Sequence, residues 1–171
     1  MIWRRALLVL TLAIVGLALE TSVFGQATLV GAKPELLVLI TVAIAMADGP
    51  AFGAITGFVL GMLTDSVLHL PQGVSALTFT IAGYTVGRVR AQVQRPSAWL
   101  PIIMVSVSTF LSVLLYAALT FVIGRATLSP LHVVRDAALA GLYNALLTPF
   151  VFPALRVLCA RMRPRSSEVL R

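Results

Sequence analysis

The sequence has little charge and almost no cysteine. Only 11% of its 171 residues are charged, whereas 59% are hydrophobic, and the mean hydropathy is +0.99. A water-soluble fold exposes far more polar surface than this composition can supply. The single cysteine, Cys159, excludes an internal disulfide framework and a Cys-x-x-Cys metal site. The composition therefore predicts a protein whose main solvent is lipid.

The sequence also lacks a long polar segment and the common catalytic motifs. Six membrane spans of about 20 residues would use roughly 120 positions, which leaves only short loops. There is no Gly-x-Ser-x-Gly elbow and no phosphate-binding loop, and neither His69 nor His132 has a second histidine or a cysteine three or four residues away. The net charge of +7 comes from cations that flank apolar runs rather than gather on one polar face. We therefore expect no enzyme activity, no cofactor, no metal and no nucleic acid partner.

The apolar runs predict an all-α, polytopic membrane bundle of six transmembrane helices with both termini in the cytoplasm. We expect one transmembrane domain over residues 1–160 and a basic cytoplasmic tail over residues 161–171. The second run is short: counted from Pro34 it gives about 21 Å of helix, less than the roughly 30 Å of the hydrocarbon layer. It must thin the bilayer, begin earlier or be shielded by protein. The six runs cover residues 6–24, 36–47, 51–68, 74–87, about 100–124 and 136–159.

Cationic residues set the orientation of the bundle. With six spans and an inside amino terminus, ten of the 13 cations fall on the cytoplasmic side, and only Lys33, Arg125 and Arg135 fall outside. This asymmetry in short loops is typical of the positive-inside rule. The first run also resembles a signal peptide that could be cleaved after residue 27, but its length and the presence of Glu20 favour retention. The ten inner cations are Arg4, Arg5, Arg88, Arg90, Arg95, Arg156, Arg161, Arg163, Arg165 and Arg171.

Glycines at regular spacing mark the third and fourth runs. Gly53, Gly57 and Gly61 recur every four residues and drift about 40° per step, so they form one face without side chains. Such faces let helices approach closely in lipid, where no hydrophobic effect drives association. Gly83 and Gly87 give the fourth run a similar pair. The simplest interpretation is that these two runs pack on each other, and the alternative is that a partner protein uses one of the faces.

Asp65 lies one turn beyond the glycine face. An ionisable side chain at mid-membrane costs about 2.5 to 3.5 kcal/mol, so Asp65 should face protein or water. Glu20, Glu35 and Asp136 also fall toward the outer side, which raises the hypothesis of a proton or cation relay. Helix-end capping or snorkelling explains each carboxylate separately. The segment Asp48-Gly49-Pro50 predicts a tight turn between the second and third runs.

Three stretches of the chain resemble one protein family. They are Gly53-Ala-Ile-Thr-Gly-Phe-Val-Leu-Gly-Met-Leu-Thr-Asp65, Pro71-Gln-Gly-Val-Ser-Ala-Leu77 and Gly83-Tyr-Thr-Val-Gly87-Arg88. Together with Pro34-Glu35, the turn at Asp48, the chain length and the basic tail, they resemble the MreD family of bacterial rod shape-determining proteins. The specific part covers about a third of the chain, and elsewhere the likeness is one of hydropathy and length. The short second run and the arginine-rich tail depart from many members.

This resemblance implies a non-enzymatic, multi-pass scaffold in the bacterial cytoplasmic (inner) membrane. Its implied partners are a bitopic MreC-like protein, the MreB filament, a RodA-like glycosyltransferase and a penicillin-binding protein, which together build the lateral peptidoglycan. The family is also similar in fold to the substrate-binding subunits of energy-coupling-factor vitamin importers, so such a subunit is the alternative function. An importer needs an outward pocket lined by aromatic and polar side chains. The short outer loops without tryptophan favour the scaffold, and a channel or proton-coupled carrier is a third hypothesis.

Overall fold

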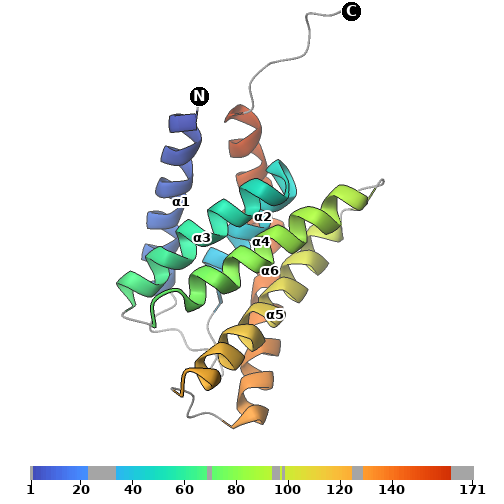
Figure 1. Ribbon diagram of the computed structural model, residues 1–171. Helices are drawn as coiled ribbons and strands as arrows, with labels where there is room; N and C mark the ends of the chain where they lie inside the picture. The colour runs from blue at the N-terminus through green and yellow to red at the C-terminus, as the bar shows by residue number, and fades with distance from the viewer. Residues whose placement is uncertain are drawn as a thin grey trace, which may run out of the picture.

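The structure is a computed structural model, and it describes residues 2–22, 34–68, 71–93, 97, 99–124 and 129–162. These residues form helices and no strand (Figure 1), so the prediction of an all-α fold is confirmed. The number of membrane crossings and the side on which each terminus lies stay predictions. The helices are α1 (Ile2–Ser22), α2 (Leu36–Asp48), α3 (Pro50–Val67), α4 (Val74–Gln92), α5 (Leu100–Val122) and α6 (Pro130–Met162).

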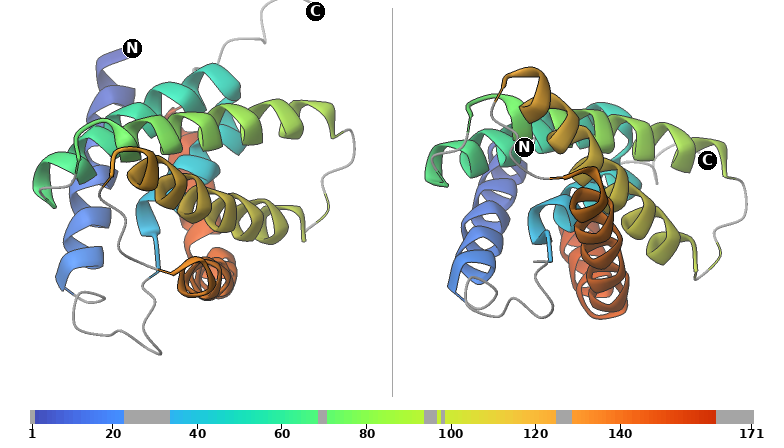
Figure 2. Two further views of the ribbon diagram at one scale, coloured as in Figure 1. Left: turned by 60° about the horizontal axis from the view of Figure 1, so that its bottom comes forward. Right: turned by 90° about the horizontal axis from the view of Figure 1, so that it is seen from below.

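Among the described residues, five helices surround one short central helix, α2. In Figure 2, α2 lies between α1 and α6, and α3 and α4 cross this row on one side. The most extensive contact joins α3 to α4, followed by α5 with α6, while α2 touches all five other helices. In Figure 1 the first residues of α1 and the last residues of α6 lie at the same end of the bundle. This arrangement puts α2 in the core.

Burial of α2 explains how so short an apolar helix is accommodated. Its 13 residues span about 20 Å, and every residue from Leu36 to Ala45 is buried inside the protein. Because α2 meets protein on all sides, its length need not match the thickness of the bilayer. Of the three explanations that the sequence allows, the structure favours shielding by protein.

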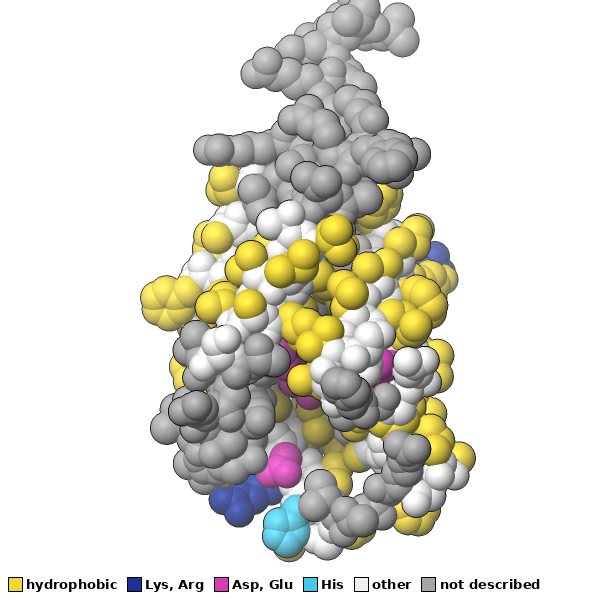
Figure 3. All heavy atoms as spheres, turned by 90° about the vertical axis from the view of Figure 1, so that its left-hand side faces the viewer, with side chains coloured by type: hydrophobic (Ala, Val, Ile, Leu, Met, Phe, Trp, Pro, Cys, Tyr) yellow, Lys and Arg dark blue, Asp and Glu magenta, His cyan; other side chains and the backbone are white. Residues whose placement is uncertain are grey.

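The surface of the bundle is apolar, as a lipid-facing surface should be. Figure 3 shows hydrophobic side chains predominating among the described residues on one face. Among the described residues, three helical segments are long and apolar enough to cross a membrane: Pro50–Val67, Leu100–Val122 and Pro130–Leu155. Two further segments, Val9–Glu20 and Leu36–Asp48, are apolar but shorter. The length and hydropathy of these helices are thus typical of a membrane protein.

Several helices extend beyond the apolar runs that predicted them. α4 continues past Gly87 to Gln92, and α6 begins at Pro130 rather than at residue 136. Hydropathy locates the apolar part of a helix, but backbone hydrogen bonding continues through polar residues until a cap or a break. Pro130 suits the first helical position, where a missing N–H has no intrahelical partner to lose. α6 runs as one helix through Pro149 and Pro153, and it passes the predicted tail boundary at residue 161.

Candidate functional site

The turn between α2 and α3 is as short as a helical hairpin allows. α2 ends at Asp48 and α3 begins at Pro50, so Gly49 alone joins them. Gly49 has φ of 90°, a left-handed value that glycine adopts without steric cost. Its N–H donates to the Ala45 carbonyl at 3.0 Å, and its own carbonyl accepts from the Gly53 N–H at 2.9 Å. The turn therefore fixes the angle at which α3 leaves the core.

The glycines of α3 lie directly against the backbone of α4. A Cβ atom added at Gly57 would come within 2.5 Å of the Phe79 carbonyl carbon. One added at Gly61 would come within 2.5 Å of the Ala76 nitrogen. Real Cβ atoms essentially never approach so closely, and backbone atoms cannot swing aside as a side chain does. The close approach of the two helices at these positions therefore requires glycine, which has a hydrogen atom in place of a side chain.

The glycines of α4 complete the crossing from the other side. Gly83 faces Gly53, so that a Cβ on Gly83 would lie 2.6 Å from the Gly53 carbonyl carbon. Gly87 faces Pro50, at the first turn of α3, with a corresponding distance of 2.5 Å to its Cα. All of these glycines are buried within the chain. Because α4 occupies the glycine face of α3, a partner protein would have to displace α4 to reach it.

Asp65 links the end of α3 to the start of α4. Its side chain is only 1% exposed, and its carboxylate accepts hydrogen bonds from three backbone N–H groups at the start of α4. The donors are Gly73 at 2.8 Å, Ser75 at 3.3 Å and Ala76 at 3.5 Å. These groups belong to the N-cap and the first turn of α4, where N–H groups have no partner within the helix. Asp65 thus caps the next helix in space rather than its own.

The position of Asp65 also matches the electrostatics of α4. A helix N-terminus carries a partial positive charge, and a carboxylate there is stabilised by it. A buried carboxylate loses its hydration shell, and three N–H donors replace much of it. Of the two explanations that the sequence offered for this residue, capping agrees with the geometry and snorkelling does not. The contact of Gly87 with Pro50 and the Asp65 cap hold α3 and α4 together at opposite ends, with the other glycine contacts between them.

A second polar contact ties α2, α5 and α6 together. Asn144, in the middle of α6, is fully buried, and its Nδ2 donates to the Glu35 carbonyl at 2.8 Å and to Thr109 Oγ1 at 2.9 Å. Glu35 is the N-cap residue of α2, so this amide satisfies a backbone group where that helix begins. The sequence reasoning missed Asn144. A lone asparagine within an apolar run was the available signal, because a buried amide in a membrane protein needs partners on other helices.

The cations that were assigned to topology are only partly described. Arg88 is exposed at the end of α4, and Arg90 donates from Nη1 to the Val93 carbonyl at 3.1 Å. Arg135 is exposed on α6. Arg4, Arg5, Arg156 and Arg161 also lie on helices, but their side chains are not described. The remaining ones lie outside the described residues: Lys33, Arg95, Arg125, Arg163, Arg165 and Arg171.

The residues that were weighed for metal binding do not come together. His69 lies outside the described residues, and His132 is exposed near the start of α6, where its ring contacts the Ser129 hydroxyl. Within the described part of the chain no group of three histidine, cysteine or acidic side chains could hold a metal ion. That the protein binds no metal stays a prediction.

Comparison with known proteins gives one match. The sequence model of the family described as rod shape-determining protein MreD matches residues 3–160, which is nearly the whole chain. No curated protein and no solved structure matches the chain. The match extends well beyond the third of the chain in which the short motifs lie.

Proposed function

Because the chain belongs to the rod shape-determining protein MreD family, we propose that it is a non-enzymatic scaffold of the cell-elongation machinery. Membership makes it a membrane protein of rod shape determination. The proposal adds that it crosses the bacterial inner membrane six times with both termini in the cytoplasm. It further adds that the protein binds an MreC-like bitopic protein and supports lateral peptidoglycan synthesis. The observation that carries the proposal is the family match over residues 3–160.

The geometry of α3 and α4 supports a scaffold role. A scaffold positions other proteins, so it needs a surface that holds its shape while partners bind. The backbone contacts at Gly57 and Gly87 and the Asp65 cap constrain the α3–α4 pair at three points. In this proposal the glycines act indirectly, by fixing the hairpin. Large apolar side chains remain exposed on α5 and α6 and could meet partner helices or lipid.

Depletion of the protein in a rod-shaped host tests the proposed function. We expect cells to become round and wide while vitamin uptake stays normal, and re-expression of the wild-type chain should restore rods. A useful matched control is Ala138→Phe, which adds a large side chain at an exposed position of α6 and should also restore rods. Normal shape combined with a vitamin requirement would favour the importer alternative and contradict the scaffold.

Co-purification tests the proposed partners separately. The solubilised wild-type protein should retain an MreC-like bitopic protein, and its purified form alone should show no turnover. MreB filaments, a RodA-like glycosyltransferase and a penicillin-binding protein should enter the same complex when all are expressed together. A titration with vitamins should show no saturable binding. Retention of none of these proteins, with the chain folded and abundant, would contradict the proposal.

A further inference from the structure

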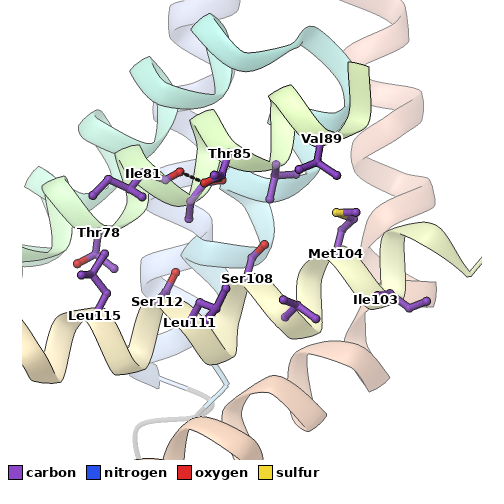
Figure 4. Close-up of a pocket in the computed structure, with 13 residues that line it drawn as sticks. Thr78, Ile81, Thr85, Val89, Ile103, Met104, Ser108, Leu111, Ser112 and Leu115 are labelled. Atoms are coloured by element: carbon purple, nitrogen blue, oxygen red, sulfur yellow. Dashed lines mark hydrogen bonds between the residues drawn. The ribbon is translucent and has the colours of Figure 1, made fainter. Parts of the chain in front are cut away.

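An apolar groove of about 470 Å³ runs between α4 and α5, on a different side of α4 from the glycine contact (Figure 4). On α4 its lining extends from Thr78 to Val89, and on α5 from Ile103 to Leu115. At 1.5 Å per residue, both stretches are about 17 to 18 Å long. Every lining side chain in this described region is uncharged. The groove is thus suited to an apolar, elongated occupant rather than to a charged solute.

One polar atom in the groove stands out. Ser112 is only 3% exposed, and its hydroxyl has no hydrogen-bond partner among the described residues. Figure 4 shows this side chain pointing from α5 toward α4. The threonines across the groove differ, because Thr78 Oγ1 donates to the Val74 carbonyl at 2.8 Å and Thr85 Oγ1 donates to the Ile81 carbonyl. Ser112 is therefore the group that an occupant would satisfy.

The depth of Ser112 discriminates between lipid and protein as the occupant. It lies 12 residues after Leu100 in a helix of 23 residues, which is near the middle of the predicted span. Lipid ester and phosphate oxygens lie at the interface, and the hydrocarbon at this depth offers no hydrogen-bond acceptor. An acyl chain would fill the groove and leave the hydroxyl unpaired. A transmembrane helix can bring a serine, threonine, asparagine or glutamine side chain to the same depth.

Two other occupants fit the groove less well. A second copy related by a twofold axis would set groove against groove, and two concave surfaces do not fill each other. The chain's own carboxyl-terminal segment, after Met162, carries Arg163, Arg165 and Arg171, which do not suit an uncharged groove. A single helix presents one ridge of side chains, and the groove between two helices admits one ridge.

We propose that the α4–α5 groove is the docking site for the transmembrane helix of a bitopic partner, with a side-chain oxygen of that helix accepting a hydrogen bond from Ser112. This proposal rests on the scaffold function proposed above and adds the surface through which the partner binds. The glycine contact holds one side of α4 against α3, so the groove on its other side has a fixed wall. Binding uses side-chain packing along the groove and one hydrogen bond at its centre.

Photo-crosslinking in intact cells tests the location. A photoreactive residue replaces Val107, which lines the groove and is 50% exposed. The matched control position is Leu142 on α6, which is 55% exposed. It lies at a similar depth because its neighbour Gly141 packs against Ser106. We expect a crosslink to the MreC-like bitopic protein from position 107 and none from 142. A crosslink from 142 alone would overturn the proposal.

Substitutions test the energetics in the full complex. Ala82→Phe fills the groove and should abolish retention of the bitopic protein, whereas Ala138→Phe adds the same side chain at an exposed position of α6 and should not. Ser112→Ala keeps the shape and removes the donor. Hydrogen bonds between membrane helices contribute only modestly to the free energy of association. We therefore expect Ser112→Ala to weaken binding of the bitopic protein about three- to tenfold. Ser112→Ala stays informative even where Ala82→Phe lowers the abundance of the protein.

The outcomes separate the groove from the function. When the wild-type protein retains the bitopic partner and neither Ala82→Phe nor Ser112→Ala weakens retention, the groove assignment is wrong and the scaffold function stands. A wild-type protein that retains no bitopic partner contradicts the scaffold function itself. Loss of a co-purified lipid or of self-association in Ala82→Phe, with partner retention unchanged, also overturns the proposal. Loss of partner retention in both variants, with normal abundance and monomer mass, supports it.

Discussion

Replacing Gly57 by alanine adds one methyl group at the closest point between α3 and α4. The new Cβ would lie 2.5 Å from the Phe79 carbonyl carbon and 2.9 Å from the Thr80 nitrogen. Carbon atoms in contact normally sit about 3.5 to 4.0 Å apart, so the helices would have to separate by about 1 Å. A gap of that size forfeits roughly a quarter to a half of each van der Waals contact along the seam. Neighbouring glycines at Gly53 and Gly61 would lose contact as well.

The net effect of Gly57→Ala follows from two opposing terms. Overpacking typically costs about 1 to 3 kcal/mol. Alanine recovers up to about 1 kcal/mol in a helix interior. We therefore expect the free energy of unfolding to fall by about 1 to 2 kcal/mol. Gly57→Leu should cost about 3 kcal/mol or more, because the larger side chain meets the same immobile backbone.

Gly16 provides the matched control for this substitution. It also lies buried in a helix, but a Cβ there would meet only the side-chain tips of Ile40 at 2.8 Å and Leu37 at 3.1 Å. These tips can move, so Gly16→Ala should change stability by less than about 1 kcal/mol. Thermal unfolding in detergent and abundance in the membrane measure both variants. Wild-type stability in both Gly57→Ala and Gly57→Leu would refute the packing argument. Gly57→Leu protein that keeps wild-type stability but has lost its bitopic partner would instead make the glycine face an intermolecular one.

Three further predictions test the cap, the buried amide and the topology. Asp65→Asn should lower the free energy of unfolding by about 1 to 2 kcal/mol, because the neutral amide accepts fewer N–H groups and loses its attraction to the α4 dipole; an unchanged melting temperature would contradict this. Asn144→Leu should cost about 1 to 3 kcal/mol, because it removes the donor to the buried Thr109 hydroxyl and leaves the Glu35 carbonyl with the Leu39 N–H alone, and a gain in thermal stability would refute that role. Reporter fusions after Arg95 and Arg171 should read as cytoplasmic and one after Arg125 as external, and an external carboxyl terminus would exclude six spans. A mature chain that begins after residue 27 would show that the first segment is a signal peptide.

The glycine spacing could be interpreted from sequence because it depends on helix geometry alone. Residues four apart in a helix share a face, so Gly53, Gly57 and Gly61 had to project in nearly one direction. Which backbone lies on that face is a tertiary question, and the similar pair Gly83 and Gly87 made the following helix the simplest candidate. In the structure α4 lies there. The role of this face in partner binding stays a prediction.

Hydropathy could not reveal how α2 is solvated. Lipid and a protein interior are both apolar, so Leu36–Asp48 reads the same whether it faces lipid or five other helices. Length was the only clue, because about 20 Å is too short for an exposed span. The helix ends were similarly hidden, since Arg88 and Arg90 lower the hydropathy of α4 without interrupting its hydrogen bonds.

The partners of the buried polar side chains could not be predicted from sequence, for a different reason. Asp65 caps a helix that starts nine residues later, and Asn144 reaches a carbonyl 109 positions away. Local capping patterns connect a side chain to its own helix within three residues, so neither contact has a sequence signature. Only the cost of burying such groups in lipid signals that partners exist. The unpaired hydroxyl of Ser112 follows the same logic, with its partner outside the chain.

The two sides of α4 connect these observations. One side touches α3 backbone to backbone, where a change as small as a methyl group forces separation. The other side borders an open groove whose lining is uncharged and mostly apolar, with Ser112 near its middle. A helix cannot shift on one side without moving its other side, so a substitution at Gly57 also displaces the wall that Thr78 and Val89 form. Partner loss in a destabilised glycine variant therefore reports on the groove through α4, whereas partner loss in Ser112→Ala at unchanged stability reports on the groove directly.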